Sequence, residues 1–144
     1  MEYKKINNKY ILRLDPKEEI VSTIKDLCTK ESINCGTITG IGAVNELMIG
    51  LFNPSNKEYK SKTLKDNFEI ASLTGNISVM NNEVYLHLHI CVTDENFNAF
   101  GGHLNSAIIS ATGEITITKI DTTIERKFSE KIGLNLYEFN KEEI

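Results

Sequence analysis

The sequence predicts an α+β fold with a largely antiparallel sheet and one main amphipathic helix near the N-terminus. Apolar residues follow a clear helical repeat once, before residue 34, and the later apolar segments have the length and alternation of strands. Short turn clusters join these segments. The chain has 144 residues, a length that suits one hydrophobic core, and contains no linker or internal repeat. We therefore expect a single domain over residues 1–144.

The helix is expected to follow a short strand at residues 10–14. Asp15 can cap it, Pro16 suits the first helical position, and Glu18 lies three residues after the cap. This order is typical of a helix N-terminus. The helix should end near residues 32–34, and its buried face is expected to consist of Ile20, Val21, Ile24, Leu27 and Cys28.

Strands are expected from Gly36 onward. Asn81 and Asn82 predict a tight turn, because asparagine tolerates positive φ, and residues 53–56 form a second turn cluster. Residues 57–67 are polar, which indicates a loop or an exposed hairpin. The expected strands cover residues 37–44, 46–52, 68–73, 77–80, 83–93 and 112–120.

Composition excludes several classes of protein. No apolar run approaches the roughly 18 residues of a membrane span. The N-terminal residues have no apolar core followed by a cleavage site, so we expect a cytoplasmic protein. Cys28, Cys35 and Cys91 are odd in number and form no C-x-x-C pair, which predicts free thiols rather than disulfides.

Charge argues against a nucleic-acid groove. The formal net charge is −4, and Arg13 and Arg126 are the two arginines of the sequence. Proteins that bind DNA by neutralising phosphates normally carry an excess of Lys and Arg on one face. Four lysines between residues 57 and 65 form a loose cluster, but acidic residues dilute it, which indicates a solvated loop.

Two of the three histidines lie on the clearest strand. Side chains alternate between the two faces of a strand, so Val84, Leu86, Leu88, Ile90 and Val92 share one apolar face that must be buried. The opposite face carries Tyr85, His87, His89 and Cys91. Residues His87 and His89 lie roughly 7 Å apart at Cα, so both imidazoles can reach one metal ion with Zn–N distances of about 2 Å.

The third histidine, His103, follows the pair Gly101 and Gly102. Paired glycines permit backbone conformations that other residues resist, so we expect a loop that folds His103 back over the strand. Three neutral imidazoles with an open fourth position suit zinc or another divalent metal. The alternative is that the strand histidines are half-exposed and His103 is an ordinary loop residue.

Two further residues are candidate neighbours of this site. Cys91 is a potential fourth ligand or reactive thiol, although a packed thiol is the commoner case. Glu69 lies in an otherwise apolar strand, where it either faces solvent or acts as a general base beside the metal.

The motifs in their order resemble the plant and prokaryote conserved (PPC) domain over about residues 10–139. They are Tyr10-Ile-Leu-Arg-Leu, Gly40-Ile-Gly-Ala-Val, Phe68-Glu-Ile-Ala-Ser-Leu-Thr-Gly, His87-Leu-His and Gly101-Gly-His-Leu. The resemblance is to the stand-alone prokaryotic type. It implies an α+β fold, a homotrimer and, as in some members, a metal such as zinc held by His87, His89 and His103.

The same resemblance carries a DNA-binding label. Plant members join this domain to AT-hooks with an Arg-Gly-Arg-Pro core, which this sequence lacks. Three functions therefore stay open: a trimeric metal-binding protein, a metal-dependent enzyme, and a DNA-binding or transcription-associated protein. The sequence identifies no small-molecule ligand or substrate.

Overall fold

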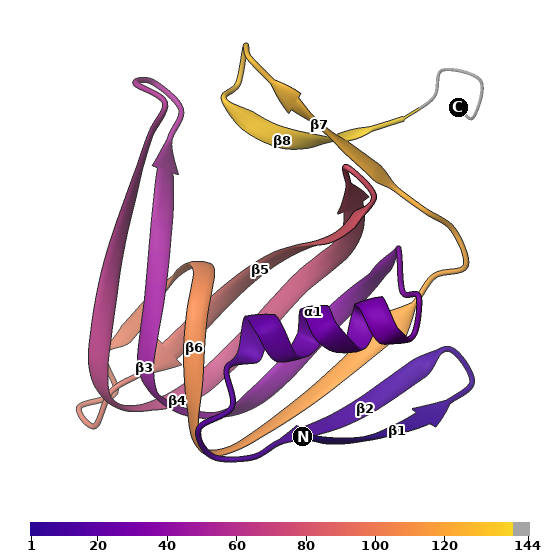
Figure 1. The fold of residues 1–144 in the computed structure, drawn as a ribbon. Helices are drawn as coiled ribbons and strands as arrows, with labels where there is room; N and C mark the ends of the chain where they lie inside the picture. Colours follow the sequence, from indigo (N-terminus) through magenta and orange to yellow (C-terminus); the bar gives the residue numbers. More distant parts are fainter. Residues whose placement is uncertain (140–144) are drawn as a thin grey trace.

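The computed structural model describes residues 1–139, which form one eight-stranded, largely antiparallel sheet and a single helix (Figure 1). The fold is therefore sheet-dominated, with its helix near the N-terminus, as expected. The elements in chain order are β1 (Glu2–Ile6), β2 (Lys9–Leu14), α1 (Ile20–Lys30), β3 (Gly36–Asn53), β4 (Glu58–Met80), β5 (Glu83–Thr93), β6 (Ala99–Lys119), β7 (Glu125–Ser129) and β8 (Leu134–Glu138).

The long strand β6 closes the sheet on itself. Residues 103–119 of β6 pair with β3, residues 113–118 also pair with β2, and residues 99–103 pair with β5, which in turn pairs with β4. Strands β3, β4, β5 and β6 thus form a continuous ring of antiparallel pairs. Closure places residue 103 beside both β5 and β3, because it pairs with residue 89 on one side and residue 50 on the other.

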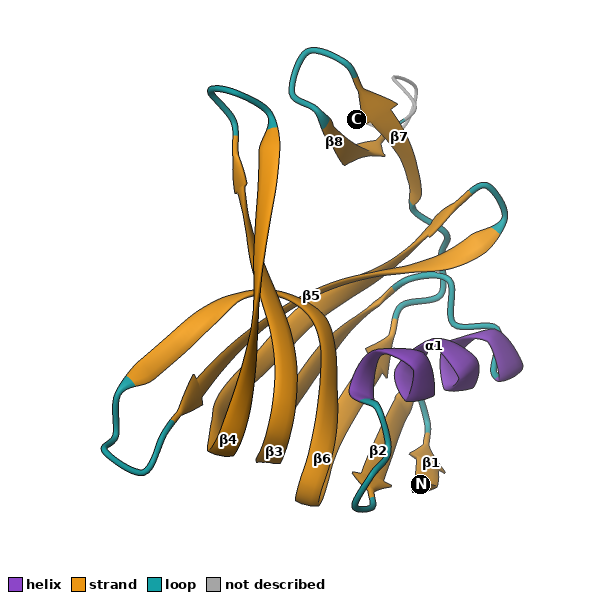
Figure 2. Ribbon diagram, turned by 60° about the vertical axis from the view of Figure 1, so that its left-hand side comes forward, coloured by secondary structure: helices purple, strands orange, loops and turns teal. Residues whose placement is uncertain are grey.

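Helix α1 covers one face of the sheet (Figure 2). Its buried side chains Ile20, Ile24, Leu27 and Cys28 join the main core cluster with Leu88 and other strand residues. Burial raises the pKa of the Cys28 thiol to about 12, so this thiol is packed and inert. All three cysteines are unpaired, as predicted.

The helix begins later than predicted. Asp15 does not cap it: Lys17 has a φ of 76°, and the cap is Glu19, whose carboxylate accepts from the backbone N–H groups of Val21 and Ser22. Glu19 also accepts from the N–H of Ala107 on β6 at 3.0 Å. A tertiary hydrogen bond, which no local pattern reveals, therefore selects the cap.

Several strands are longer than predicted. The two strands expected between residues 37 and 52 are one strand, β3, with a register shift between Val44 and Glu46. Of the two alternatives expected for residues 58–67, a loop or an exposed hairpin, the exposed hairpin is confirmed: these residues belong to β4 and pair with β3. The turn at Asn81 and Asn82 is confirmed, with φ values of 54° and 64°. Strands β1, β7, β8 and the first half of β6 were not predicted.

Two hairpins rise from the same end of the sheet (Figures 1 and 2). One is the tip of β3 and β4, and the other is formed by β7 and β8, which joins β4 through a parallel bridge between Val79 and Glu125.

Within residues 1–139, the helix is too short to cross a membrane.

Candidate metal centre

Residues His87, His89 and His103 converge on one point of the structure. Each can offer a ring nitrogen such that all three nitrogens lie within 4.8 Å of one another. The ring centroids are 5.1 Å apart for His87 and His89, 5.2 Å for His87 and His103, and 5.7 Å for His89 and His103. Nitrogens on a tetrahedral metal with bonds of about 2.0 Å lie about 3.3 Å apart, so small side-chain rotations suffice to close the set around an ion.

The strand alternation predicted for β5 positions two of the ligands. Leu88, Ile90 and Val92 are buried, whereas His87 is half-buried and His89 is exposed on the opposite face. A continuous antiparallel pairing with β4 holds this register, with His87 opposite Asn76 and His89 opposite Thr74. The apolar face thus directs both imidazoles away from the core.

The third ligand is placed differently from the prediction. Gly101 and Gly102 do not form a loop; they lie in strand β6, opposite Cys91 and Ile90, and His103 lies directly opposite His89. The glycines are needed for close packing rather than for a turn. A Cβ at Gly102 would lie 2.7 Å from the carbonyl oxygen of Gly50, and one at Gly101 would lie 2.9 Å from that of Ile90. The glycines thus allow β6 to fit between its neighbours where the sheet closes.

Tyr59 supports His103 from the other side. The two rings meet edge to face with centroids 6.2 Å apart, and the Tyr59 hydroxyl donates to Oδ1 of Asn105 at 2.6 Å. The Tyr59 hydroxyl occupies the space that a Cβ on Gly50 would need. Because Gly50 has no Cβ, it leaves room for the Tyr59 ring beside His103.

The surroundings of His87 and His103 favour their neutral forms. Burial, followed by the charges of His103, Arg126 and His89, lowers the pKa of His87 to about 4. Burial and the charge of His89 also lower the pKa of His103. A neutral imidazole is the form that ligates metal, so no proton must be displaced from His87 at neutral pH.

A cavity of about 800 Å³ opens beside the histidines. It lies between the tip of the β3–β4 hairpin, strands β5 and β6, and the β7–β8 hairpin. The lining residues, among those that the structure describes, include no aspartate or glutamate. They are Gly50, Leu51, Phe52, Pro54, Tyr59, Asn76, Tyr85, His87, His89, Gly102, His103, Arg126, Ile132, Leu134, Asn135, Leu136 and Tyr137.

The other candidate neighbours lie apart from this cavity. Cys91 is half-buried between Ser72 and Gly101, two residues along β5 from His89, and does not join the ligand cluster of the described residues. Glu69 pairs with Thr93 and lines a different depression, together with Asp94 and Glu95. Of the proposed neighbours, the structure brings Gly102 to the cavity and leaves Glu69 on another part of the sheet.

Sequence reasoning missed Arg126. This side chain lines the histidine cavity, and its charge acts on His87. Its Cζ lies 4.8 Å from the ring centroid of Tyr85 and 4.2 Å from that of Tyr137. Two signals were available, because Arg126 is one of two arginines in the sequence and β8 alternates Leu134, Asn135 and Leu136.

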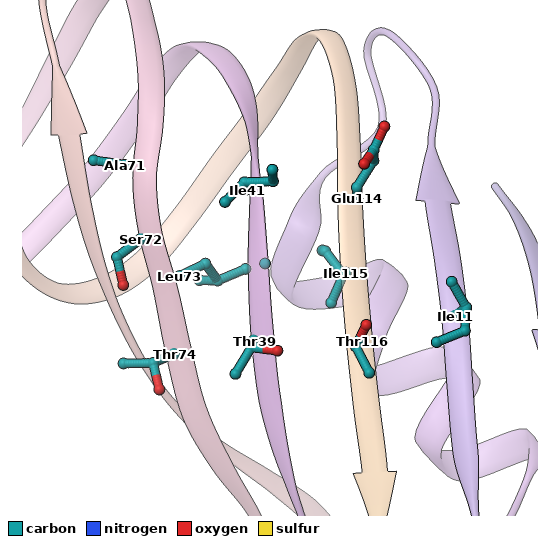
Figure 3. A pocket seen from close by; sticks show the side chains of 11 residues that line it. Ile11, Thr39, Ile41, Ala71, Ser72, Leu73, Thr74, Glu114, Ile115 and Thr116 are labelled. Atoms are coloured by element: carbon teal, nitrogen blue, oxygen red, sulfur yellow. The ribbon is translucent and has the colours of Figure 1, made fainter.

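A second depression of about 510 Å³ crosses the sheet among β2, β3, β4 and β6 (Figure 3). Threonine and serine hydroxyls line it together with Ile11 and Ile41, which are 43% and 56% exposed. Glu114 is the one titratable residue in its lining. Because no second titratable group of residues 1–139 lines this depression beside Glu114, the histidine cavity is the stronger candidate for a functional site.

The donor set suits a divalent metal with an open position. Three imidazoles leave at least one coordination site for water or a ligand atom. A metal bound there would supply Lewis acidity and lower the pKa of a bound water. The chain's own contribution is to hold three imidazoles together beside a largely apolar cavity.

Comparison with solved structures finds close relatives over nearly the whole chain. A "putative dna binding protein" from Bacteroides thetaiotaomicron is 45% identical, with a TM-score of 0.93 and 96% of each chain covered. A plant- and prokaryote-conserved protein from Pyrococcus horikoshii is 34% identical, with a TM-score of 0.84, covering 97% of this chain and 95% of its own. A metal-containing protein from Archaeoglobus fulgidus is 30% identical, with a TM-score of 0.85, covering 96% and 99%. A search of curated proteins found no match.

A family model described as the plants and prokaryotes conserved (PCC) domain matches residues 1–121. The matched segment contains every strand that carries a histidine and ends before β7. The chain therefore belongs to the plants and prokaryotes conserved domain family, the PPC family that its motifs indicated.

Proposed function

We propose that this protein binds one divalent metal ion, of the zinc type, through His87, His89 and His103 and acts as a homotrimer. The observation that carries the proposal is the cluster of three ring nitrogens within 4.8 Å. The cluster contains all the histidines of the sequence. The description of the Archaeoglobus fulgidus relative as metal-containing supports it.

Zinc fits the donor set better than a hard cation does. Imidazole suits zinc and neighbouring transition metals, whereas calcium and magnesium prefer oxygen ligands. Among the described residues, the cavity lining adds no carboxylate that would favour a hard cation. The histidine pair His87 and His89, two positions apart on a rigid strand, is already preorganised for a compact ion.

Metal analysis of protein purified without a histidine tag tests the proposal. We expect about one zinc per chain after incubation with zinc and dialysis, and a large loss in the His89→Ala variant. Ser72→Ala is the matched control, because Ser72 lies exposed on the neighbouring strand β4 opposite Cys91 and offers no ligand nitrogen. Zinc content near zero in the wild type, or equal in wild type and His89→Ala, would contradict the metal site.

The trimer is supported by the family resemblance and by exposed apolar side chains. Ile41 and Leu51 of β3 are 56% and 66% exposed, and Ile11 of β2 is 43% exposed. Burial of such residues against a second chain would remove apolar area from water. Light scattering should give three times the chain mass of 16.2 kDa. A mass of one chain at micromolar concentration would contradict the assembly.

We also propose a cytoplasmic location, on the sequence argument alone.

DNA binding is the second candidate, because the relative from Bacteroides thetaiotaomicron carries that description. Lys57, Lys60, Lys62 and Lys65 lie on the protruding β3–β4 hairpin, but Lys65 pairs with Glu46 and Lys57 donates to the carbonyl of Glu130. Fluorescence anisotropy with duplex DNA at low salt would detect binding, which should weaken steeply with salt and after Lys60→Ala and Lys62→Ala substitution. Absence of binding at low salt would exclude it.

A metal-dependent enzyme is a third candidate. It is favoured by the open cavity beside the imidazoles, since a buried ion would have no room for substrate. No carboxylate of the described residues lines that cavity to act as a general base. Glu69, the acid suggested by the sequence, lines a different depression. The observed lining therefore favours ligand binding over acid–base hydrolysis.

A further inference from the structure

We propose that the histidine cavity binds a small carboxylate with an apolar body, that Arg126 recognises the carboxylate, and that the β7–β8 hairpin encloses the apolar part. This inference deepens the proposed function, because the same cavity contains the metal-binding histidines. Arg126 is nevertheless a separate recognition element on a separate strand, outside the residues that the family model matches.

Arg126 is held in one orientation by contacts on several sides. Its Nε donates to Oγ of Ser78 at 2.7 Å, and Nη1 donates to the carbonyl oxygen of Asn135 at 2.7 Å. Ser78 is itself fully buried and donates to the carbonyl of Tyr85 at 3.3 Å. Together with the cation–π contacts to Tyr85 and Tyr137, these bonds preorganise the guanidinium, which lowers the entropic cost of binding a ligand.

The guanidinium retains binding capacity. Within residues 1–139, Nη2 donates no hydrogen bond, and no carboxylate forms an ion pair with Arg126. The cavity lining contains the positive Arg126 and no negative side chain among the described residues. A half-buried cation without a counter-charge favours an anionic ligand, because a charge-assisted hydrogen bond is among the stronger polar contacts in a protein.

The rest of the cavity wall is largely apolar and therefore favours a ligand with an apolar body. Aliphatic and aromatic side chains dominate its wall away from the histidines, and the volume of about 800 Å³ lies within the range of small-molecule sites. The hairpin residues of this wall are only partly covered, with Leu134 at 39% and Leu136 at 40% exposed. The apolar wall is formed by Leu51, Phe52, Ile132, Leu134, Leu136 and Tyr137.

A single fixed guanidinium favours a carboxylate over a phosphate. A carboxylate carries one negative charge, which matches the single guanidinium and its Nη2, whereas a phosphate dianion brings more charge and more acceptors than one arginine satisfies. We therefore choose hexanoate as the probe, with acetate, hexanamide and inorganic phosphate as comparisons.

Isothermal titration of the zinc-treated wild-type protein should give the tightest binding for hexanoate. Acetate lacks the apolar body and hexanamide lacks the charge, so each should bind at least about tenfold more weakly. Inorganic phosphate should not displace hexanoate at equal concentration. Equal affinities for hexanoate and hexanamide, or preferential binding of phosphate, would overturn the proposal without the use of any variant.

Variants locate the effect at Arg126. We expect Arg126→Gln to weaken hexanoate at least about tenfold while hexanamide is unaffected. Arg126→Lys, which keeps the positive charge but lacks the planar guanidinium, should bind hexanoate more tightly than Arg126→Gln and less tightly than the wild type. Lys127→Gln is the matched control, because Lys127 is the next residue of β7 and pairs with Glu138 with its side chain 73% exposed. Unchanged hexanoate affinity in Arg126→Gln would overturn the proposal.

Zinc affinity, measured in the same samples by chelator competition, separates this inference from the proposed function. Normal zinc binding by Arg126→Gln shows that the variant is folded at the histidines. Wild-type protein that binds zinc but shows no charge preference would overturn only the carboxylate inference. Wild-type protein that binds no zinc would overturn the metal proposal, and dependence of hexanoate binding on Arg126 would still support this one.

Discussion

The two faces of strand β5 differ in their surroundings: one packs in the core, and the other borders a cavity. On the face toward α1, Leu88, Ile90 and Val92 are buried and packed in the main core cluster. On the opposite face, His87 is half-buried and His89 is exposed, next to a cavity. The inner face specifies the register of the strand, and the outer face uses that register to present ligands. Stability and function should therefore respond separately to substitutions one residue apart.

The largest expected effect separates the two faces directly. Leu88 is 1% exposed, so Leu88→Ala should lower the free energy of unfolding by about 2–5 kcal/mol through lost burial and a residual cavity. His89→Ala, on the adjacent residue, should change the stability of the metal-free protein by less than about 1 kcal/mol. Urea denaturation in the presence of a chelator measures both. Equal losses would show that the outer face also contributes to the core.

Zinc should make His89→Ala more costly relative to the wild type than it is without metal. Zinc that binds only the folded state at a free concentration 100 times its Kd adds about 2.7 kcal/mol to stability. The wild type and Leu88→Ala should both show a zinc-dependent rise in Tm, and His89→Ala should not. Thermal unfolding with and without zinc is the measurement. A rise of equal size in His89→Ala would mean that the ion binds elsewhere.

Substitution of Glu19 tests how helix α1 is held against the sheet. Its carboxylate caps α1 and also accepts from the N–H of Ala107, so Glu19→Ala should lower stability by about 1–2 kcal/mol. Asp15→Ala is the control, because Asp15 was the cap expected from sequence and does not cap the helix. Urea denaturation should give a clearly lower free energy of unfolding for Glu19→Ala than for Asp15→Ala. The reverse order would contradict the tertiary cap.

The smallest expected effect is a pH dependence of the metal-free outer face. The pKa of His87 is lowered to about 4, against an ordinary value of 6.5, mainly by burial. The unfolded state therefore binds more protons than the folded state between these values, so stability falls as the pH decreases from 6.5 toward 4. Tm measured with chelator should fall less steeply over this window in His87→Gln. Parallel curves for wild type and variant would contradict the shift.

Local patterns predicted the strand that presents the histidines. Alternation in β5 has a period of two residues, and the apolar face was unbroken, so the directions of His87 and His89 followed from the chain alone. The turn at Asn81 and Asn82 was likewise local. For residues 58–67 the sequence left a loop and an exposed hairpin open, because this segment is exposed over most of its length and so has no apolar alternation that would decide between them.

The sequence by itself determined the sheet-dominated fold class, the buried face of β5 and the residue types of a candidate metal site. Only the tertiary structure decided where His103 lies, because strand β6 closes the sheet and pairs it with His89 across the β5–β6 seam, where Gly101 allows the close approach to β5. The tertiary structure also placed Arg126 beside the same cavity. The physical reason is that side-chain direction along a strand is a local property, whereas the pairing of strands far apart in the chain depends on the packing of the whole sheet.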